Sequence, residues 1–130
     1  MEANAHPDPR RRLGALGERL AREHLERAGY EVIERNYRSR RGELDVIALG
    51  HGALVFCEVK TRLAGGSAGP IGPLDAIGHA KRRRLRMLAR EWLSTNGSHR
   101  DAETLRFDAI GITLSGAGAL LVLEHVEGAF

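Results

Sequence analysis

The stretch that decides the fold runs from Gly42 to Arg62 and reads GELDVIALGHGALVFCEVKTR. Two runs rich in Val, Ile, Leu and Phe meet at Gly50-His51-Gly52, which is the turn chemistry of a β-hairpin. The stretch therefore predicts two antiparallel strands joined by a tight turn.

Three charged residues, Asp45, Glu58 and Lys60, interrupt these apolar runs. Because strand side chains alternate between the two faces of a sheet, Glu58 and Lys60 should share a face with Phe56, and Cys57 should lie on the other. Charges within apolar strands carry a desolvation cost, which pairing or a metal ion can offset. That cost indicates that the three side chains serve a purpose.

The register of the hairpin decides whether the two carboxylates meet. If His51 and Gly52 form a two-residue loop, Asp45 falls opposite Glu58, with Cβ atoms roughly 5 Å apart. A three-residue loop without a bulge would place Asp45 opposite Cys57 instead. In the first register, one divalent cation could contact both carboxylates.

The charged residues resemble the PD-(D/E)xK motif of the restriction-endonuclease-like nucleases. Asp45 is followed, after twelve intervening residues, by Glu58-Val59-Lys60, and Leu44 stands where the motif's name has proline. A wider set of residues is similar to the YraN-like family of small bacterial proteins, which is related to archaeal Holliday junction resolvases. That set comprises Gly17-Glu18, Asn36-Tyr37-Arg38, Gly42-Glu43-Leu44-Asp45, Phe56 to Arg62, Lys81 and the terminal Ala129-Phe130. The similarity covers nearly the whole chain after the first dozen residues.

The resemblance implies a metal-dependent endonuclease that hydrolyses DNA, with branched or junction DNA among its substrates. Asp45 and Glu58 would hold Mg²⁺ or Mn²⁺, and the carbonyl of Val59 would complete the shell. Lys60 would orient the attacking water and stabilise developing charge. Glu18 matches an accessory metal ligand or catalytic acid of related nucleases, although helix geometry alone favours a surface glutamate there. Glu43 is a second-rank candidate.

Two alternatives from other classes stay open. One is a nucleic-acid-binding module that keeps the nuclease fold without cleaving, because the same carboxylates could form a structural ion-pair network with Lys60 and nearby arginines. The other is a protein-interaction adaptor that uses the helix face near Trp92.

The basic residues favour a polyanionic partner. Eighteen of the twenty are arginines, whose planar fork matches phosphate, although the net charge is only +3. They gather in two clusters, one before the hairpin and one from Lys81 to Arg90. DNA is therefore the expected partner, a homodimer is left open, and no membrane partner is expected. The residues predicted to contact nucleic acid are Arg38, Arg40, Arg41, Arg62, Lys81, Arg82 and Arg83.

The remaining pattern predicts one α/β domain at residues 13–130 after a flexible arm at 1–12. We expect a mixed, largely antiparallel sheet of about five strands flanked by two helices, in the restriction-endonuclease-like order αβββαββ. The helices are predicted at 13–28 and 75–93, and the strands outside the hairpin at 30–37, 104–114 and 119–126. A loop rich in glycine and proline is expected at 63–74. Asp108 is interpreted as an exposed cross-strand partner.

Cys57 is the only cysteine of the 130 residues, so no intramolecular disulfide can form. It is predicted to be a small core residue in a reducing compartment. No run approaches membrane-spanning length, and a cytoplasmic protein is expected. The six histidines show no metal-ligand spacing, which argues against a zinc site.

Overall fold

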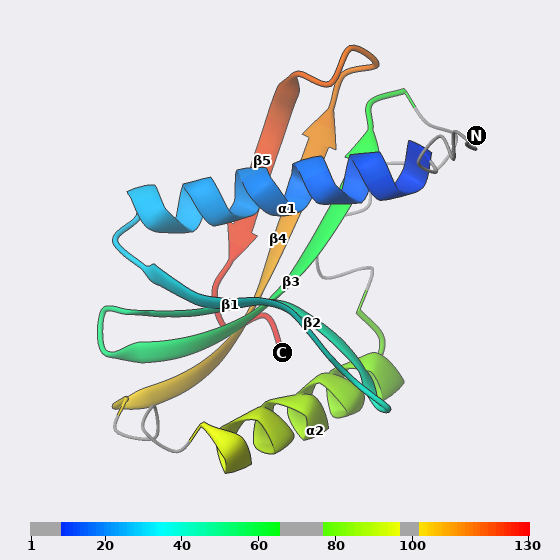
Figure 1. The fold of residues 1–130 in the computed structure, drawn as a ribbon. Coiled ribbons are helices and arrows are strands. Elements are labelled where there is room, and N and C mark those ends of the chain that lie inside the picture. The colour runs from blue at the N-terminus through cyan, green and yellow to red at the C-terminus, as the bar shows by residue number, and fades with distance from the viewer. Residues whose placement is uncertain (1–8, 66–76, 97–101) are drawn as a thin grey trace, which may run out of the picture.

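A computed structural model describes residues 9–65, 77–96 and 102–130. They form two helices and a sheet of five strands in the predicted order αβββαββ. The elements are α1 (Pro9–Arg27), β1 (Glu31–Ser39), β2 (Gly42–Gly50), β3 (Ala53–Leu63), α2 (His79–Thr95), β4 (Thr104–Leu114) and β5 (Leu120–Val126). The predicted α/β class and element order are therefore confirmed (Figure 1).

The element boundaries differ from the predicted ones mainly in the helices. Helix α1 begins at Pro9, four residues before the expected start, so residues 9–12 of the expected arm are helical. Proline suits a first helical turn because its missing N–H would have no partner there. Gly29 has φ +95° just after the helix, as expected of a C-terminal cap. Residues 1–8, and residues 66–74 of the expected loop, lie outside the described ranges.

The sheet has the order β1-β2-β3-β4-β5. All neighbouring pairs are antiparallel except β3 and β4, which run parallel, so the sheet is mixed and largely antiparallel as predicted. A parallel pair needs a crossover connection, and α2 lies on the segment that supplies it.

The central hairpin has the two-residue loop. Gly50 pairs with Ala53, and both loop residues have positive φ, +53° at His51 and +77° at Gly52. Positive φ at both central positions is the mark of a type I′ turn, whose twist matches that of the flanking strands. The two-residue loop is therefore confirmed, and its register, which is paired as far as Val46 with Cys57, places Asp45 and Glu58 directly after the last pair.

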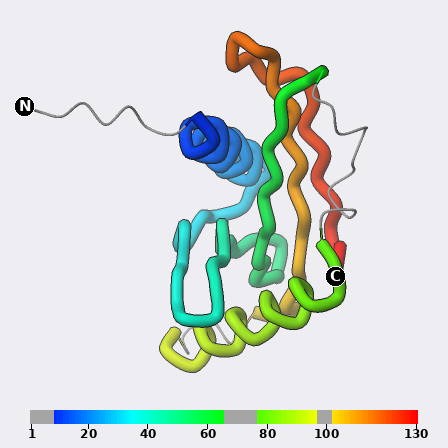
Figure 2. The backbone as a smooth tube through the Cα atoms, turned by 90° about the vertical axis from the view of Figure 1, so that its right-hand side faces the viewer, coloured from blue at the N-terminus to red at the C-terminus, as the bar shows by residue number. Residues whose placement is uncertain are grey.

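The helices pack on opposite faces of the sheet, and each covers its own core (Figure 2). Val55, Cys57 and Val59 of β3 pack in the core beside α1, whereas Leu54 and Phe56 pack in the core beside α2. The alternation predicted for this strand is confirmed, and so is the burial of Cys57. Glu58 and Lys60 consequently project on the α2 side.

Candidate active site

The candidate site lies at a fork in the sheet, the point after Val46 where β2 separates from β3. The last register pair between these strands is Val46 with Cys57, while β2 stays paired with β1 as far as Gly42. Leu44 and Ile47 both pack in the core beside α2, which strict alternation would not allow, so β2 twists sharply at Asp45. Figure 1 shows the β1–β2 hairpin curving toward α2 while β3 continues beside β4.

Asp45 replaces the hydrogen bond that β3 loses at this fork. Its Oδ2 accepts a hydrogen bond of 2.8 Å from the amide of Val59. Asp45 and Glu58 are 8% and 6% exposed and line one cleft of about 170 Å³, together with Glu43 and Lys81. The structure thus brings the two predicted carboxylates together. A typical small-molecule pocket is larger, at about 300 to 1,000 Å³.

The charge of Asp45 is poorly compensated. Burial raises its pKa to about 7, the negative charge of Glu58 acts in the same direction, and the Val59 amide only partly opposes them. Among the described residues no ion pair to Asp45 is formed within 4 Å. A carboxylate held this way favours any ligand that brings positive charge.

Two lysines flank Glu58. Lys81 of α2 places its Nζ 2.7 Å from Glu58 Oε1, and although burial opposes its charge, the hydrogen bond to Glu58 raises the pKa of Lys81. Desolvation, followed by the nearby positive charge of Lys81, lowers the pKa of Lys60. Lys81 was predicted to contact nucleic acid, and here it is the counter-ion of a site carboxylate.

Glu18 of α1 turns toward the fork. Burial and the charge of Glu43 raise its pKa, while a hydrogen bond from Asn36 opposes them. Asn36 has φ +53° and lies between the β1–β2 pairs Arg35 with Val46 and Tyr37 with Leu44. Close packing allows this placement, because a Cβ at Gly17 would collide with the Thr61 side chain of β3. Glu18 also lines a second pocket with Asp45 and is half-buried, whereas helix geometry alone favoured a surface glutamate.

The donor set fits a hard cation. Mg²⁺ is commonly bound by one or two carboxylates and substrate phosphates rather than by a full protein cage. Asp45 and Glu58 supply two such carboxylates. The charges of Glu18 and Glu43 lie close enough to raise the pKa of Asp45 further. Residues 9–65, 77–96 and 102–130 contain no group of three or more His, Cys, Asp or Glu side chains poised to hold a metal. A cation here would therefore depend on the pair.

The arginines predicted to contact DNA are spread over several elements. Arg38 pairs with Glu43 at 2.8 Å, beside the cleft. Arg40 and Arg41 form the turn between β1 and β2. Arg62 donates to Thr113 Oγ1 at 3.2 Å on β4. Arg82 donates to the carbonyl of Ile77, and Arg83 is exposed.

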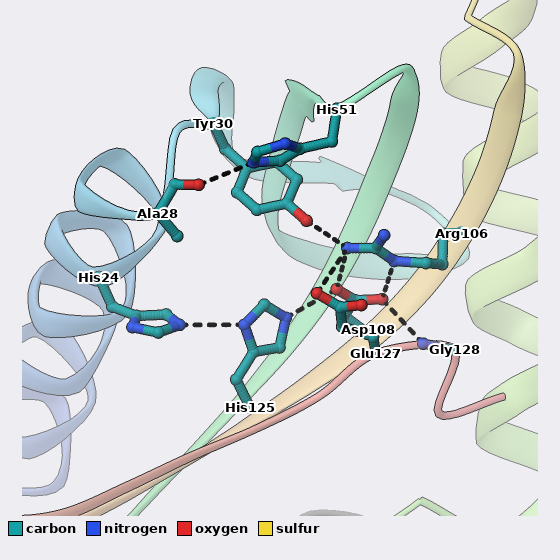
Figure 3. Close-up of polar contacts among 9 residues, drawn as sticks. All are labelled: His24, Ala28, Tyr30, His51, Arg106, Asp108, His125, Glu127 and Gly128. Atoms are coloured by element: carbon teal, nitrogen blue, oxygen red, sulfur yellow. Dashed lines mark hydrogen bonds and ion pairs between the residues drawn. The ribbon is translucent and has the colours of Figure 1, made fainter.

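The interpretation of Asp108 as an exposed residue is wrong, because its side chain is fully buried. Arg106 contacts both of its oxygens, at 2.8 and 2.9 Å, and His125 and the amide of Gly128 complete the shell at 2.7 and 3.0 Å (Figure 3). Although burial favours the neutral form, these bonds hold the pKa of Asp108 below its usual range. His24 then joins His125 to α1 at 3.0 Å.

Asp108 is thus a structural anchor that ties β4 to β5 and to α1. The pattern Arg-x-Asp in an otherwise apolar strand was the one signal in the sequence that could have revealed it. Both carboxylates are buried, but Asp108 accepts hydrogen bonds from Arg106, His125 and the amide of Gly128, whereas in the described part of the chain Asp45 accepts one from the amide of Val59.

The side chain of Trp92 points into the core and not to the surface of α2. Trp92 is fully buried, and its indole N–H donates to Glu34 Oε1 at 2.8 Å. Trp92 itself therefore belongs to the core and could not be part of a contact surface on this helix.

Fold and cleft together define a single-domain α/β protein with a carboxylate and lysine cluster at a forked hairpin. The chain belongs to the uncharacterised protein family UPF0102, whose model matches residues 17–112. This is the YraN-like family of the resemblance.

The relatives share nearly the whole length of the chain. A UPF0102 protein of Rhodococcus jostii is 46% identical over 118 residues, which cover 91% of this chain and 95% of the relative. One from Streptomyces griseus is 46% identical, with 89% and 93% covered. One from Chlorobium chlorochromatii is 40% identical, with 91% and 90% covered. Among the described residues, neither helix is long and apolar enough to cross a membrane.

Proposed function

We propose that this protein is a metal-dependent DNA endonuclease whose site is the cleft of Asp45 and Glu58. The observation that carries the proposal is the only partly compensated charge of Asp45 beside Glu58 at the fork. The likewise buried Asp108, in contrast, accepts hydrogen bonds on both of its oxygens. Burying a carboxylate without compensation costs stability, and such sites concentrate where a ligand or reaction uses them.

Asp45 and Glu58 would hold the cation, and Glu18, which shares a neighbouring pocket with Asp45, is the accessory residue that the resemblance implies. When bound, Mg²⁺ or Mn²⁺ supplies a Lewis acid for the phosphoryl oxygen and lowers the pKa of a bound water. The carbonyl of Val59 is the further predicted ligand, and its amide already fixes the rotamer of Asp45.

Lys60 would act on the reacting phosphate rather than on the metal. Its ammonium projects from the same face as Glu58, two residues along the strand, and cannot ligate a cation while protonated. A positive charge there would orient the attacking water and stabilise the charge that develops in the transition state. A cytoplasmic location, with Cys57 kept reduced, agrees with this role.

The binding-module alternative keeps one observation in its favour. Lys81 already neutralises Glu58 at 2.7 Å, so part of the acidic cluster is satisfied without any cation. In that alternative the cluster stabilises the fork and the arginines bind DNA without cleavage.

A nuclease assay decides between the two. Purified protein is incubated with linear duplex, single-stranded and four-way junction DNA, in Mg²⁺ or Mn²⁺ and in chelator. We expect cleavage of at least one form that requires the cation and is lost in Glu58→Gln, with DNA binding retained. Binding of these forms with no cleavage in either metal would refute the enzyme and favour the module.

A further inference from the structure

A larger groove lies between the β1–β2 turn and the outer side of α2. It has a volume of about 760 Å³ and is lined by Arg40, Arg41, Arg90, Ser39, Ser94 and Glu91, with Met87 beside them. None of these residues belongs to the carboxylate cleft. The groove and the carboxylate cleft nevertheless lie between the same two parts of the fold, the β1–β2 hairpin and α2. Gly42, directly after the turn, and Arg84 of α2 line the cleft.

The one carboxylate in the groove is already engaged. Ser39 Oγ donates to Glu91 Oε2 at 3.1 Å, and Arg41 Nε lies 3.9 Å from the same oxygen. Arg41 also contacts the sulfur of Met87 with Nη1, at 3.8 Å. In the described part of the chain, neither Arg40 nor Arg90 has an acidic partner within 4 Å. The groove therefore presents net positive charge.

The chemistry of the lining matches phosphate. Guanidinium forks with neighbouring hydroxyl groups recognise phosphate oxygens, which accept several hydrogen bonds at once. Proteins that hold single strands usually add aromatic rings on which the bases stack. The lining has no aromatic ring among the described residues, and Trp92 on the same helix is buried. A groove with arginines and hydroxyl groups but no stacking ring suits the backbone of a strand whose bases are already paired.

We propose that this groove binds the phosphate backbone of a duplex DNA arm adjoining the carboxylate cleft. The inference rests on the proposed function for its choice of DNA, and it names duplex as the form held beside the reacting phosphate. The arm would be held without regard to sequence, because backbone contacts carry no base information.

The test measures DNA binding in chelator, so that neither metal nor cleavage enters the result. Fluorescence anisotropy compares a labelled duplex with a single strand of equal length, over a range of salt concentrations. The variants are Arg90→Gln and the double variant Arg41→Gln with Arg90→Gln. The matched control is Arg86→Gln, which removes an exposed arginine of the same helix that does not line the groove.

We expect wild type to prefer duplex and the double variant to bind duplex about tenfold or more weakly. The slope of log affinity against log salt should become shallower by about 2, because each substituted arginine no longer neutralises a phosphate. Arg86→Gln should change both quantities much less than Arg90→Gln. Thermal unfolding verifies the fold, and Arg90→Gln keeps the test valid if the double variant is unstable.

Equal reductions of affinity in Arg86→Gln and Arg90→Gln would show diffuse attraction and overturn the inference. Single-strand binding as tight as duplex, with the same reduction in the double variant, would overturn the assignment to duplex. The proposed function fails separately. A protein that never cleaves but shows the expected groove effects refutes the nuclease alone, and one that cleaves while the double variant binds normally refutes the groove alone.

Discussion

Replacing Asp45 by Asn isolates the effect of a negative charge that the fork compensates only in part. Asn has nearly the same shape, and its side-chain oxygen can still accept the hydrogen bond from the Val59 amide, 2.8 Å away in wild type. The substitution therefore removes ionisation while keeping this hydrogen bond. If an ionised Asp45 lowers the stability of the fold, the variant should be the more stable protein at neutral and alkaline pH.

The pH dependence follows from the raised pKa. In the folded protein Asp45 has a pKa of about 7, against an ordinary value of 3.8 in the unfolded chain. Between these values only the folded state holds the proton, so the free energy of unfolding of wild type decreases as pH rises, by about 1.4 kcal/mol per unit. From pH 5 to pH 7 the decrease is about 2 to 3 kcal/mol, and it levels off above pH 7. Asp45→Asn lacks this decrease.

Urea unfolding at half-unit steps from pH 5 to pH 8 measures the difference. We expect the stability advantage of Asp45→Asn to grow by about 2 to 3 kcal/mol over this range. Glu26→Gln, which alters an exposed carboxylate of α1, should instead follow wild type. Saturating Mn²⁺ at pH 8 should stabilise wild type but not Asp45→Asn. Parallel curves for wild type and Asp45→Asn, or a less stable variant at pH 8, would refute the reasoning.

Three further substitutions test separate parts of the structure. Lys60→Met should lower cleavage about a hundredfold while Mn²⁺ and DNA affinities stay near wild type, and an unfolded variant would assign this lysine to the structure instead. Gly17→Ala should destabilise by about 1 to 3 kcal/mol in urea unfolding because its methyl group collides with β3, whereas Gly14→Ala, with open space around it, should not destabilise. Asp108→Asn should cost about 3 kcal/mol in urea unfolding, since it removes the buried negative charge that the half-buried Arg106 meets. Glu127→Gln removes an exposed partner of the same arginine and should cost under about 1 kcal/mol.

The sequence by itself determined the features that depend on local backbone chemistry. Gly50-His51-Gly52 predicted a tight turn, although its loop length stayed open until the structure showed two residues. Strict alternation along residues 53–59 placed Phe56 and Glu58 on one face and Cys57 on the other. The order of helices and strands followed from periodicity and from the breaks between the runs. These features were predictable because a turn type or a strand period involves only residues close together in the chain.

Only the tertiary structure decided what each charged side chain meets. The sharp twist of β2 at Asp45, the inward direction of Glu18 and the ion pair between Lys81 and Glu58 all depend on elements far apart in the sequence. Asp108 is the clearest case, because the partners that surround its carboxylate come from β4, β5 and the residues after β5. Burial and compensation of a charge depend on this long-range packing, which cannot be predicted from local periodicity.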